Sequence, residues 1–199
     1  MVDIAGYERK YHDERFYNEI FIQEEYKCVR SDNRDTETII DVGALAGEFG
    51  FYVYDQARTI YAIEPVESYY QELTDNIKEF GFEKVKPFNI ALAQRNAQRR
   101  ITLGGARGGN HLTDDDGQEV EAVTLATFIK EQGIEHVDVI KIDIEDGELE
   151  VFAAADFHQV ADRIDKIVGE HLGNVHEILE SYGFKATNHG INTVYAKTT

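Results

Sequence analysis

The sequence is poor in several residue types that would point to particular classes of protein. Its 199 residues include one cysteine, two prolines and no tryptophan. The lone Cys28 cannot close an internal disulfide, which agrees with a reducing compartment, and we interpret it as a buried, unreactive thiol. No run of about 18 apolar residues is present, and the first residues are charged where a signal peptide is apolar. These absences predict a soluble, cytoplasmic protein that performs no cysteine redox chemistry.

Basic residues are also few. Lysine and arginine total 20 against 38 aspartates and glutamates, so the formal net charge is −18 at pH 7. A surface this negative repels nucleic-acid backbones and anionic lipid headgroups unless basic residues cluster, and no run of basic residues is longer than two, as at Arg99-Arg100. We therefore expect a small-molecule partner, with no nucleic acid and no membrane. The sequence leaves open whether the protein forms a homo-oligomer.

The apolar content is sufficient for a folded domain. Hydrophobic residues make up 42% of the chain and include 11 tyrosines and 11 phenylalanines, which excludes a disordered acidic chain. A chain of this length removes about 70% of its unfolded surface from water around one core. We predict a single domain over residues 1–199.

From Thr38 onward, short apolar runs alternate with amphipathic stretches, which is the pattern of βαβ units. The predicted strands are 38–43, 59–64, 84–92, 137–143, 165–172, 183–188 and 191–197, and the predicted helices are 68–81, 125–132, 147–155 and 175–182. A short turn at His189-Gly190 predicts that the last two strands pair antiparallel. The fold class is therefore α/β, a doubly wound, mostly parallel seven-stranded sheet with a C-terminal antiparallel hairpin.

Two segments stand outside this alternation. Residues 1–35 carry aromatic and aliphatic side chains at helical spacing and are expected to form a helical cap over a sheet edge; the alternative is a lid over a ligand site. Residues 99–123 are expected to be an inserted segment in which two short strands flank a mobile loop, 104–117. That loop is rich in glycine, and such loops commonly close over active sites.

The first chemical motif is the strand that runs through Asp41 into Gly43 and Gly47, with an expected helix from about Glu48. Glycines here let the chain turn sharply and let a ligand approach the backbone, while the helix N-terminus offers free N–H groups. The spacing is not the G-x-G-x-x-G of dinucleotide folds. Asp41 would repel a pyrophosphate, which argues against NAD, but would suit an ammonium or a sulfonium.

The second motif is Glu64, which ends a predicted strand 21 positions after Gly43 and precedes Pro65. A carboxylate at this strand tip can accept both hydroxyl hydrogens of a ribose diol. Taken separately, the glycines could belong to an ordinary βα turn, and Glu64 could be a solvated strand-end charge. Their combined spacing favours a site for a nucleoside ligand.

The third motif follows the strand 137–143, where Asp143 is succeeded by Glu145, Asp146, Glu148 and Glu150. Carboxylates this close face water, bind a cation or have shifted pKa values. For Glu148 and Glu150 the simpler interpretation is favourable charge in the first turn of a helix. We considered a divalent metal held by Asp143, Glu145, Glu170 and His171, but no spacing distinguishes such a site and none is predicted.

Four segments in order carry a family resemblance: DVGALAGEFG, AIEPVESYYQELTDNI, NIAL and KIDIEDGELEVF. They resemble the FkbM-type family of S-adenosylmethionine-dependent methyltransferases, from Thr38 to Ile144 and on through the last strand. The resemblance implies the class I methyltransferase variant of the Rossmann-like fold, with S-adenosylmethionine as cofactor. On this basis the predicted cofactor-binding residues are Asp41, Gly43, Ala44, Gly47, Glu64, Pro65, Asn89, Ala91 and Asp143.

The implied reaction is O-methylation of a small hydroxyl-bearing metabolite or sugar. A hydroxyl acceptor needs a base, and we predict His171 for this role, with Asp143 and Glu145 as the other catalytic residues and His111 as the next candidate base. One alternative is a nucleotide-cofactor-binding oxidoreductase. Another is a catalytically idle cofactor-binding module, because Asp146 stands where the family has glycine.

Overall fold

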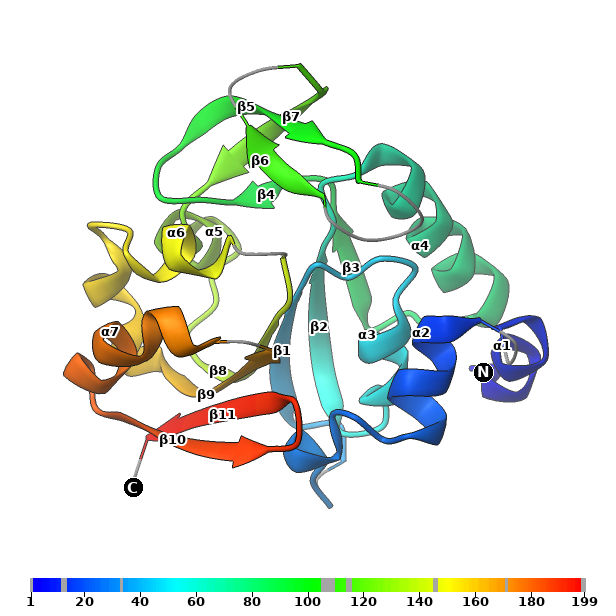
Figure 1. Ribbon diagram of the computed structural model, residues 1–199. Helices are drawn as coiled ribbons and strands as arrows, with labels where there is room; N and C mark the ends of the chain where they lie inside the picture. Colours follow the sequence, from blue (N-terminus) through cyan, green and yellow to red (C-terminus); the bar gives the residue numbers. More distant parts are fainter. Residues whose placement is uncertain are drawn as a thin grey trace.

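The computed structural model describes residues 2–11, 14–32, 34–104, 110–113, 116–144, 147–170 and 172–197. Its centre is a seven-stranded sheet in the order β10-β11-β9-β8-β1-β2-β3 (Figure 1). The strands are β1 (Glu37–Val42), β2 (Ala57–Ile63), β3 (Val85–Phe88), β8 (Val137–Ile142), β9 (Ile164–Glu170), β10 (Phe184–His189) and β11 (Asn192–Lys197).

The sheet is mixed. Strands β3, β2, β1, β8 and β9 are parallel, whereas β11 pairs antiparallel with both β9 and β10. Every residue of β1 is buried, as expected for a strand covered on both faces. The α/β class and the seven strands agree with the sequence prediction, and the antiparallel pair lies at the edge formed by the C-terminal residues.

Helices cover both faces of this sheet (Figure 1). One face packs against α1 (Ile4–Tyr11), α2 (Arg15–Tyr17), α3 (Glu48–Tyr52) and α4 (Glu67–Phe80), and the other against α5 (Leu125–Glu131), α6 (Glu148–Phe152) and α7 (His176–Ser181). Neighbouring residues of β1 illustrate the two layers, because Ile39 belongs to the first hydrophobic core and Ile40 to the second. Helix α4 ends where Gly81 adopts a φ of 75°, a left-handed stop.

A second, four-stranded sheet has the order β4-β7-β5-β6 and forms the green layer in Figure 1. Its strands are β4 (Ala91–Leu92), β5 (Ala97–Thr102), β6 (His111–Thr113) and β7 (Gln118–Val123). The predicted single strand 84–92 is therefore wrong: it divides at Asn89, whose side-chain amide donates to the carbonyls of Glu64 and Pro65. These bonds hold the chain in a turn, and the residues after it pair with β7 in the other sheet.

The described residues of the inserted segment form three strands, β5, β6 and β7, where two were predicted. Residues 105–109 and 114–115 of its loop lie outside the described residues. Its strands have a small hydrophobic cluster of their own that includes Ala93, Ile101 and Val120. This cluster explains how the second sheet stays ordered although it does not pair with the first.

The N-terminal segment packs on the face covered by α3 and α4. It contains α1, α2, a π-helical turn (Asn18–Ile22) and a 3₁₀ turn (Lys27–Val29). The ring of Tyr7 makes edge contacts with Phe51, Phe80 and Phe82. Within the described part of the chain, no helix combines the length and the apolar character needed to cross a membrane.

Candidate active site

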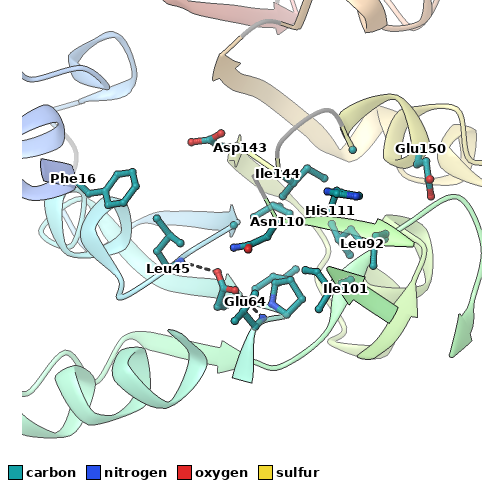
Figure 2. A pocket seen from close by; sticks show the side chains of 18 residues that line it. Phe16, Leu45, Glu64, Leu92, Ile101, Asn110, His111, Asp143, Ile144 and Glu150 are labelled. Atoms are coloured by element: carbon teal, nitrogen blue, oxygen red, sulfur yellow. Dashed lines mark hydrogen bonds between the residues drawn. The ribbon is translucent and has the colours of Figure 1, made fainter. Parts of the chain in front are cut away.

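One candidate site lies where the carboxyl ends of β1, β2 and β8 meet the second sheet. It is a cavity of about 430 Å³ with mainly apolar walls. Figure 2 shows Phe16 on one side and Leu92, Ile101 and His111 on the other. Ligands of open α/β sheets bind at this edge, and the second sheet here adds a wall that a minimal sheet would lack.

Glu64 is the carboxylate on the floor of this cavity. It is only 3% exposed, and its two oxygens accept backbone N–H groups from Leu45 at 2.9 Å and Val66 at 2.8 Å (Figure 2). Burial raises the pKa of Glu64 to about 7, although the two N–H donors oppose that rise. The carboxylate is thus held in one orientation while each oxygen keeps a further lone pair for a ligand donor.

The β1–α3 turn approaches both Glu64 and β8. Gly43 has a φ of 77°, and a Cβ at this position would overlap the carbonyl oxygen of Asp143. Leu45 also adopts a positive φ, 47°, and its N–H donates to Glu64. Gly47, with a φ of 104°, precedes the first turn of α3. Glycine is required at Gly43 because two backbone segments meet there.

A buried lysine connects the two central strands beneath this turn. Lys141 on β8 is the register partner of Asp41 on β1, and its Nζ lies 3.5 Å from Asp41 Oδ1 and 2.9 Å from the carbonyl oxygen of Gly43. Burial by itself lowers the pKa of Lys141, but the charges of Asp41 and Asp143 raise it overall. Lys141 therefore stays charged and offsets the buried carboxylate.

A second cavity, of about 160 Å³, lies beside the first and shares Phe16, Gly43, Leu45 and Asp143 with it. Asp143 stands where the two cavities meet, with a side chain that is 41% exposed and a carboxylate oxygen 4.0 Å from Lys141 Nζ. The described residues of the site thus place one accessible carboxylate between an apolar cavity and a smaller acidic one.

The model of the methyltransferase FkbM domain matches residues 41–186, which is most of the chain. The chain belongs to the FkbM methyltransferase family. No curated relative matches the sequence.

Solved structures show the same class I methyltransferase-like fold. A crystal structure of methyltransferase FkbM from Methylobacillus flagellatus KT is 16% identical with a TM-score of 0.63, over 94% of this chain and 49% of that one. TrmK from M. capricolum, solved with S-adenosylhomocysteine, is 12% identical with a TM-score of 0.57, over 90% of this chain and 69% of that one. The present chain therefore spans about half the length of the FkbM structure.

In this FkbM-family chain, some of the predicted site residues line a cavity and others lie behind its walls. Those that line a cavity are Gly43, Ala44, Glu64, Pro65, Ala91 and Asp143. Asp41, Gly47 and Asn89 line neither cavity. Asp41 is fully buried because the alternation of β1 directs it toward α3, where a Cβ on Gly50 would be 3.7 Å from its carboxylate. Asp41 contacts Lys141 at 3.5 Å, and its assignment to the cofactor site stays a prediction.

The predicted catalytic residues are only partly described. Glu145 and His171 lie outside the described residues, as does Asp146, so their roles stay predictions. Glu148 instead supports the turn after β8, because its Oε1 accepts the N–H of Ile144 at 3.1 Å. His111, the second candidate base, lines the large cavity from β6.

Sequence patterns missed several residues of this FkbM-family site. Lys141 could have been recognised from the sequence, because it is a charged residue inside a strand that is otherwise almost wholly apolar. Phe16, Glu25 and Tyr26 gave no local signal, because their place in the smaller cavity depends on how the N-terminal segment packs.

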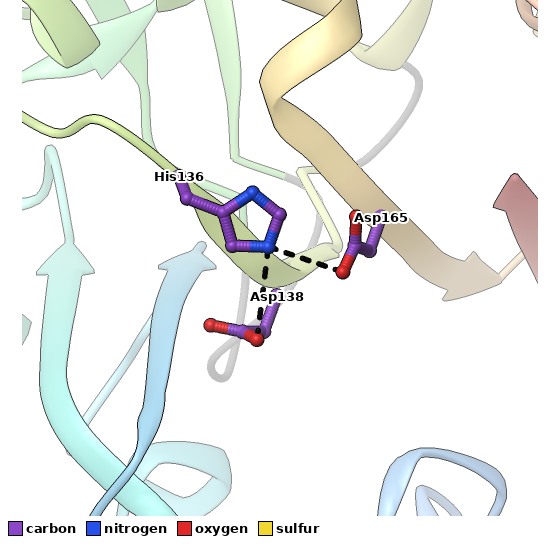
Figure 3. A group of neighbouring side chains, drawn as sticks. All are labelled: His136, Asp138 and Asp165. Atoms are coloured by element: carbon purple, nitrogen blue, oxygen red, sulfur yellow. Dashed lines mark hydrogen bonds and ion pairs between the residues drawn. The ribbon is translucent and has the colours of Figure 1, made fainter. Parts of the chain in front are cut away.

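A separate group of possible metal ligands lies at the opposite end of the sheet. His136 precedes β8, and its Nε2 is 3.1 Å from Asp165 Oδ2 and 3.8 Å from Asp138 Oδ1 (Figure 3). Asp138 also accepts the backbone N–H of Thr38 at 2.7 Å. These partly exposed side chains form a small polar cluster at the amino ends of β8 and β9, remote from both cavities.

Proposed function

We propose that the chain binds S-adenosylmethionine in the larger cavity and methylates a hydroxyl group of a small molecule. The observation that carries this proposal is Glu64, a carboxylate held in one orientation on the floor of a cavity of about 430 Å³. A strand-tip carboxylate beside apolar walls suits a nucleoside, whose ribose donates hydrogen bonds and whose base is flat and apolar. Membership of the FkbM methyltransferase family supports the same cofactor.

The residues present fit this cofactor. Val42, Ile63 and Ile144 offer apolar surface for the base, and Glu64 offers acceptors for the ribose. Asp143 lies at the junction of the cavities, where its negative charge would attract the cofactor's sulfonium or ammonium group. Two structural neighbours, TrmK and SMU.1697c from Streptococcus mutans, were solved with S-adenosylhomocysteine, which supports the choice.

When bound, the cofactor would supply a methyl group whose bond to sulfur breaks, with its electron pair left on sulfur, as an acceptor oxygen forms the new C–O bond. The chain's own contribution is to align the reactants and to exclude water from an apolar cavity. The acceptor's proton requires a base. Asp143 is exposed at the junction of the cavities and can accept it, while His171 remains the base predicted from the sequence.

Calorimetry with S-adenosylhomocysteine tests the cofactor assignment. Glu64→Ala should weaken binding by about 1.5–3 kcal/mol, the range for hydrogen bonds to a charged group. Glu67→Ala is the matched control, because Glu67 is exposed at the start of α4. Equal affinities of wild type and Glu64→Ala would remove Glu64 from the site, and binding of NAD in place of S-adenosylhomocysteine would favour the oxidoreductase alternative.

A methyl-transfer assay tests the reaction itself. Radiolabelled S-adenosylmethionine incubated with sugars and small alcohols should transfer label to a hydroxyl-bearing acceptor. Binding of the cofactor without transfer to any acceptor would instead favour the idle module.

A further inference from the structure

A histidine and two aspartates meet at the edge of the main sheet that is opposite to both cavities. His136 immediately precedes β8 and Asp138 is the second residue of that strand, a spacing that puts both side chains on one face. Asp165 is the second residue of β9. The register places it beside Asp138, because the residues on either side of the two aspartates are partners in the parallel pairing of β8 with β9. Three side chains from two strands are thus brought together by the fold.

The imidazole of His136 is directed between the two carboxylates (Figure 3). Its Nε2 lies 3.1 Å from Asp165 Oδ2 and 3.8 Å from Asp138 Oδ1, and one ligand atom of each residue lies within 4.8 Å of the other two. Nitrogen and oxygen ligands that surround Zn²⁺ at about 2.0–2.2 Å are themselves about 3–3.5 Å apart. Small movements of these side chains would therefore let all three share one ion.

The charges of the cluster favour a cation at this point. Asp138 accepts the backbone N–H of Thr38 through Oδ2, and its Oδ1 faces His136. Among the residues that the structure describes, no lysine or arginine lies within ion-pair distance of Asp138 or Asp165. An imidazole carries at most one positive charge, and like charges at corresponding positions of neighbouring strands repel each other. A divalent cation between the two carboxylates would offset that repulsion.

The donor set indicates which cations fit. Mg²⁺ and Ca²⁺ are bound in proteins mainly by oxygen ligands, whereas Zn²⁺ accepts imidazole nitrogen together with carboxylate oxygen. The side chains of His136, Asp138 and Asp165 are all partly exposed, so an ion can enter from solvent and keep water at its remaining positions. One nitrogen and two oxygens therefore favour Zn²⁺ or a similar transition-metal ion.

We propose that His136, Asp138 and Asp165 bind a divalent transition-metal ion that joins the amino ends of β8 and β9. This inference is independent of the proposed function, because the cluster is remote from both cavities. The ligands come from two strands that meet only in the folded chain. The ion therefore binds the folded state preferentially and stabilises it.

Protection of His136 from diethylpyrocarbonate, followed by peptide mass spectrometry, tests the site directly. A metal on Nε2 leaves the ring proton on Nδ1, so the imidazole has no free lone pair for the reagent. In the full chain freed of metal by a chelator, saturating Zn²⁺ should slow modification of His136 at least about tenfold. The exposed His189 of β10 is the control and should react at an unchanged rate. Mg²⁺ at the same concentration should protect neither histidine.

Calorimetry with Zn²⁺ tests the carboxylate ligands. Asp165→Asn and Asp138→Asn should each weaken the tightest Zn²⁺ binding at least about tenfold. Asp75→Asn, on the exposed side of α4, removes the same charge elsewhere and should leave it unchanged. Zn²⁺ should also raise the free energy of unfolding in urea for wild type and not for Asp165→Asn.

Three results would overturn the proposal. The first is an equal rate of His136 modification with and without Zn²⁺, which would reduce the cluster to an interaction between a histidine and two aspartates. The second is an unchanged affinity for Zn²⁺ in both Asp165→Asn and Asp138→Asn, which would place the ion elsewhere on this acidic chain. The third is equal protection by Mg²⁺, which would show attraction to charge without ligation by the imidazole.

Discussion

The raised pKa of Glu64 makes a quantitative prediction about folding. In an unfolded chain this carboxyl has a pKa of 4.5, and in the folded protein burial raises it to about 7. Because one pKa unit corresponds to about 1.4 kcal/mol, ionised Glu64 should be less favourable in the folded state by about 3 kcal/mol. The folded state binds the proton more tightly, so the stabilisation is present below pH 4.5 and is lost as the pH rises through about 7.

Urea unfolding of wild type and Glu64→Gln between about pH 4 and pH 9 measures this contribution. The other acidic groups affect both proteins alike, so the difference between the two curves isolates Glu64. Glutamine leaves the N–H of either Leu45 or Val66 without its acceptor, a pH-independent cost of about 1–3 kcal/mol. In addition to this constant difference, the free energy of unfolding of wild type should fall by about 3 kcal/mol relative to that of Glu64→Gln as the pH rises through 7. Parallel curves would refute the assigned pKa.

Protonation of the Glu64 carboxylate should also weaken the binding of a nucleoside. Ribose hydroxyls donate to the ionised carboxylate, so the affinity for S-adenosylhomocysteine should fall as the pH drops below about 7 in wild type. Glu64→Gln carries no such proton and should show a flat profile over that range. A profile that falls equally in both proteins would place the titrating group elsewhere.

Three further predictions concern the supports around the site. Lys141→Met should destabilise the protein by about 3–5 kcal/mol in urea unfolding by leaving a buried carboxylate uncompensated, whereas exposed Lys185→Met should change stability by less than about 0.5 kcal/mol. Gly133→Ala should lower the free energy of unfolding by about 1–2 kcal/mol, because the only cost at this position is the strain of a positive φ. Gly43→Ala should cost at least about 2 kcal/mol more, because its Cβ also overlaps a backbone carbonyl. Equal losses of stability in the two variants would contradict the close approach at Gly43. His136→Asn should leave the affinity for S-adenosylhomocysteine unchanged in calorimetry, since its cluster lies at the opposite end of the sheet, and a weakened affinity would contradict that placement.

Strand alternation and turn glycines made most of the main sheet predictable. Six of the seven predicted strands correspond to single observed strands, whereas 84–92 divides between β3 and β4, and α4 could be predicted from its apolar spacing and its terminal Gly81. The position of Glu64 was equally readable, because a carboxylate at the end of a buried strand must lie at the sheet edge. These features depend on local periodicity, which a single sequence displays directly.

Side-chain direction and long-range pairing were not readable in the same way. The break at Asn89 depends on hydrogen bonds to residues about 25 positions away, and the apolar run 84–92 conceals it. Asp41 illustrates a second feature that the sequence does not display. Its position near the end of a strand could be predicted, but the face on which its side chain lies could not, because a shift of one residue moves a side chain from one face of a sheet to the other. The position of Glu25 is another example, because its backbone carbonyl accepts a hydrogen bond from Asn192, near the far end of the chain.

The face on which Asp41 lies also explains the charge of the site. Asp41, Lys141 and Asp143 lie on one face of two adjacent strands, because Lys141 pairs with Asp41 and precedes Asp143 by two positions. Two carboxylates and one ammonium leave a negative charge, and Asp143 is the member exposed to ligand. Lys141 Nζ lies 3.5 Å from Asp41 and 4.0 Å from Asp143, so one ammonium is shared between two carboxylates. The three groups together carry a net negative charge at the junction of the two cavities, which a cationic ligand group can offset and an anionic one would increase.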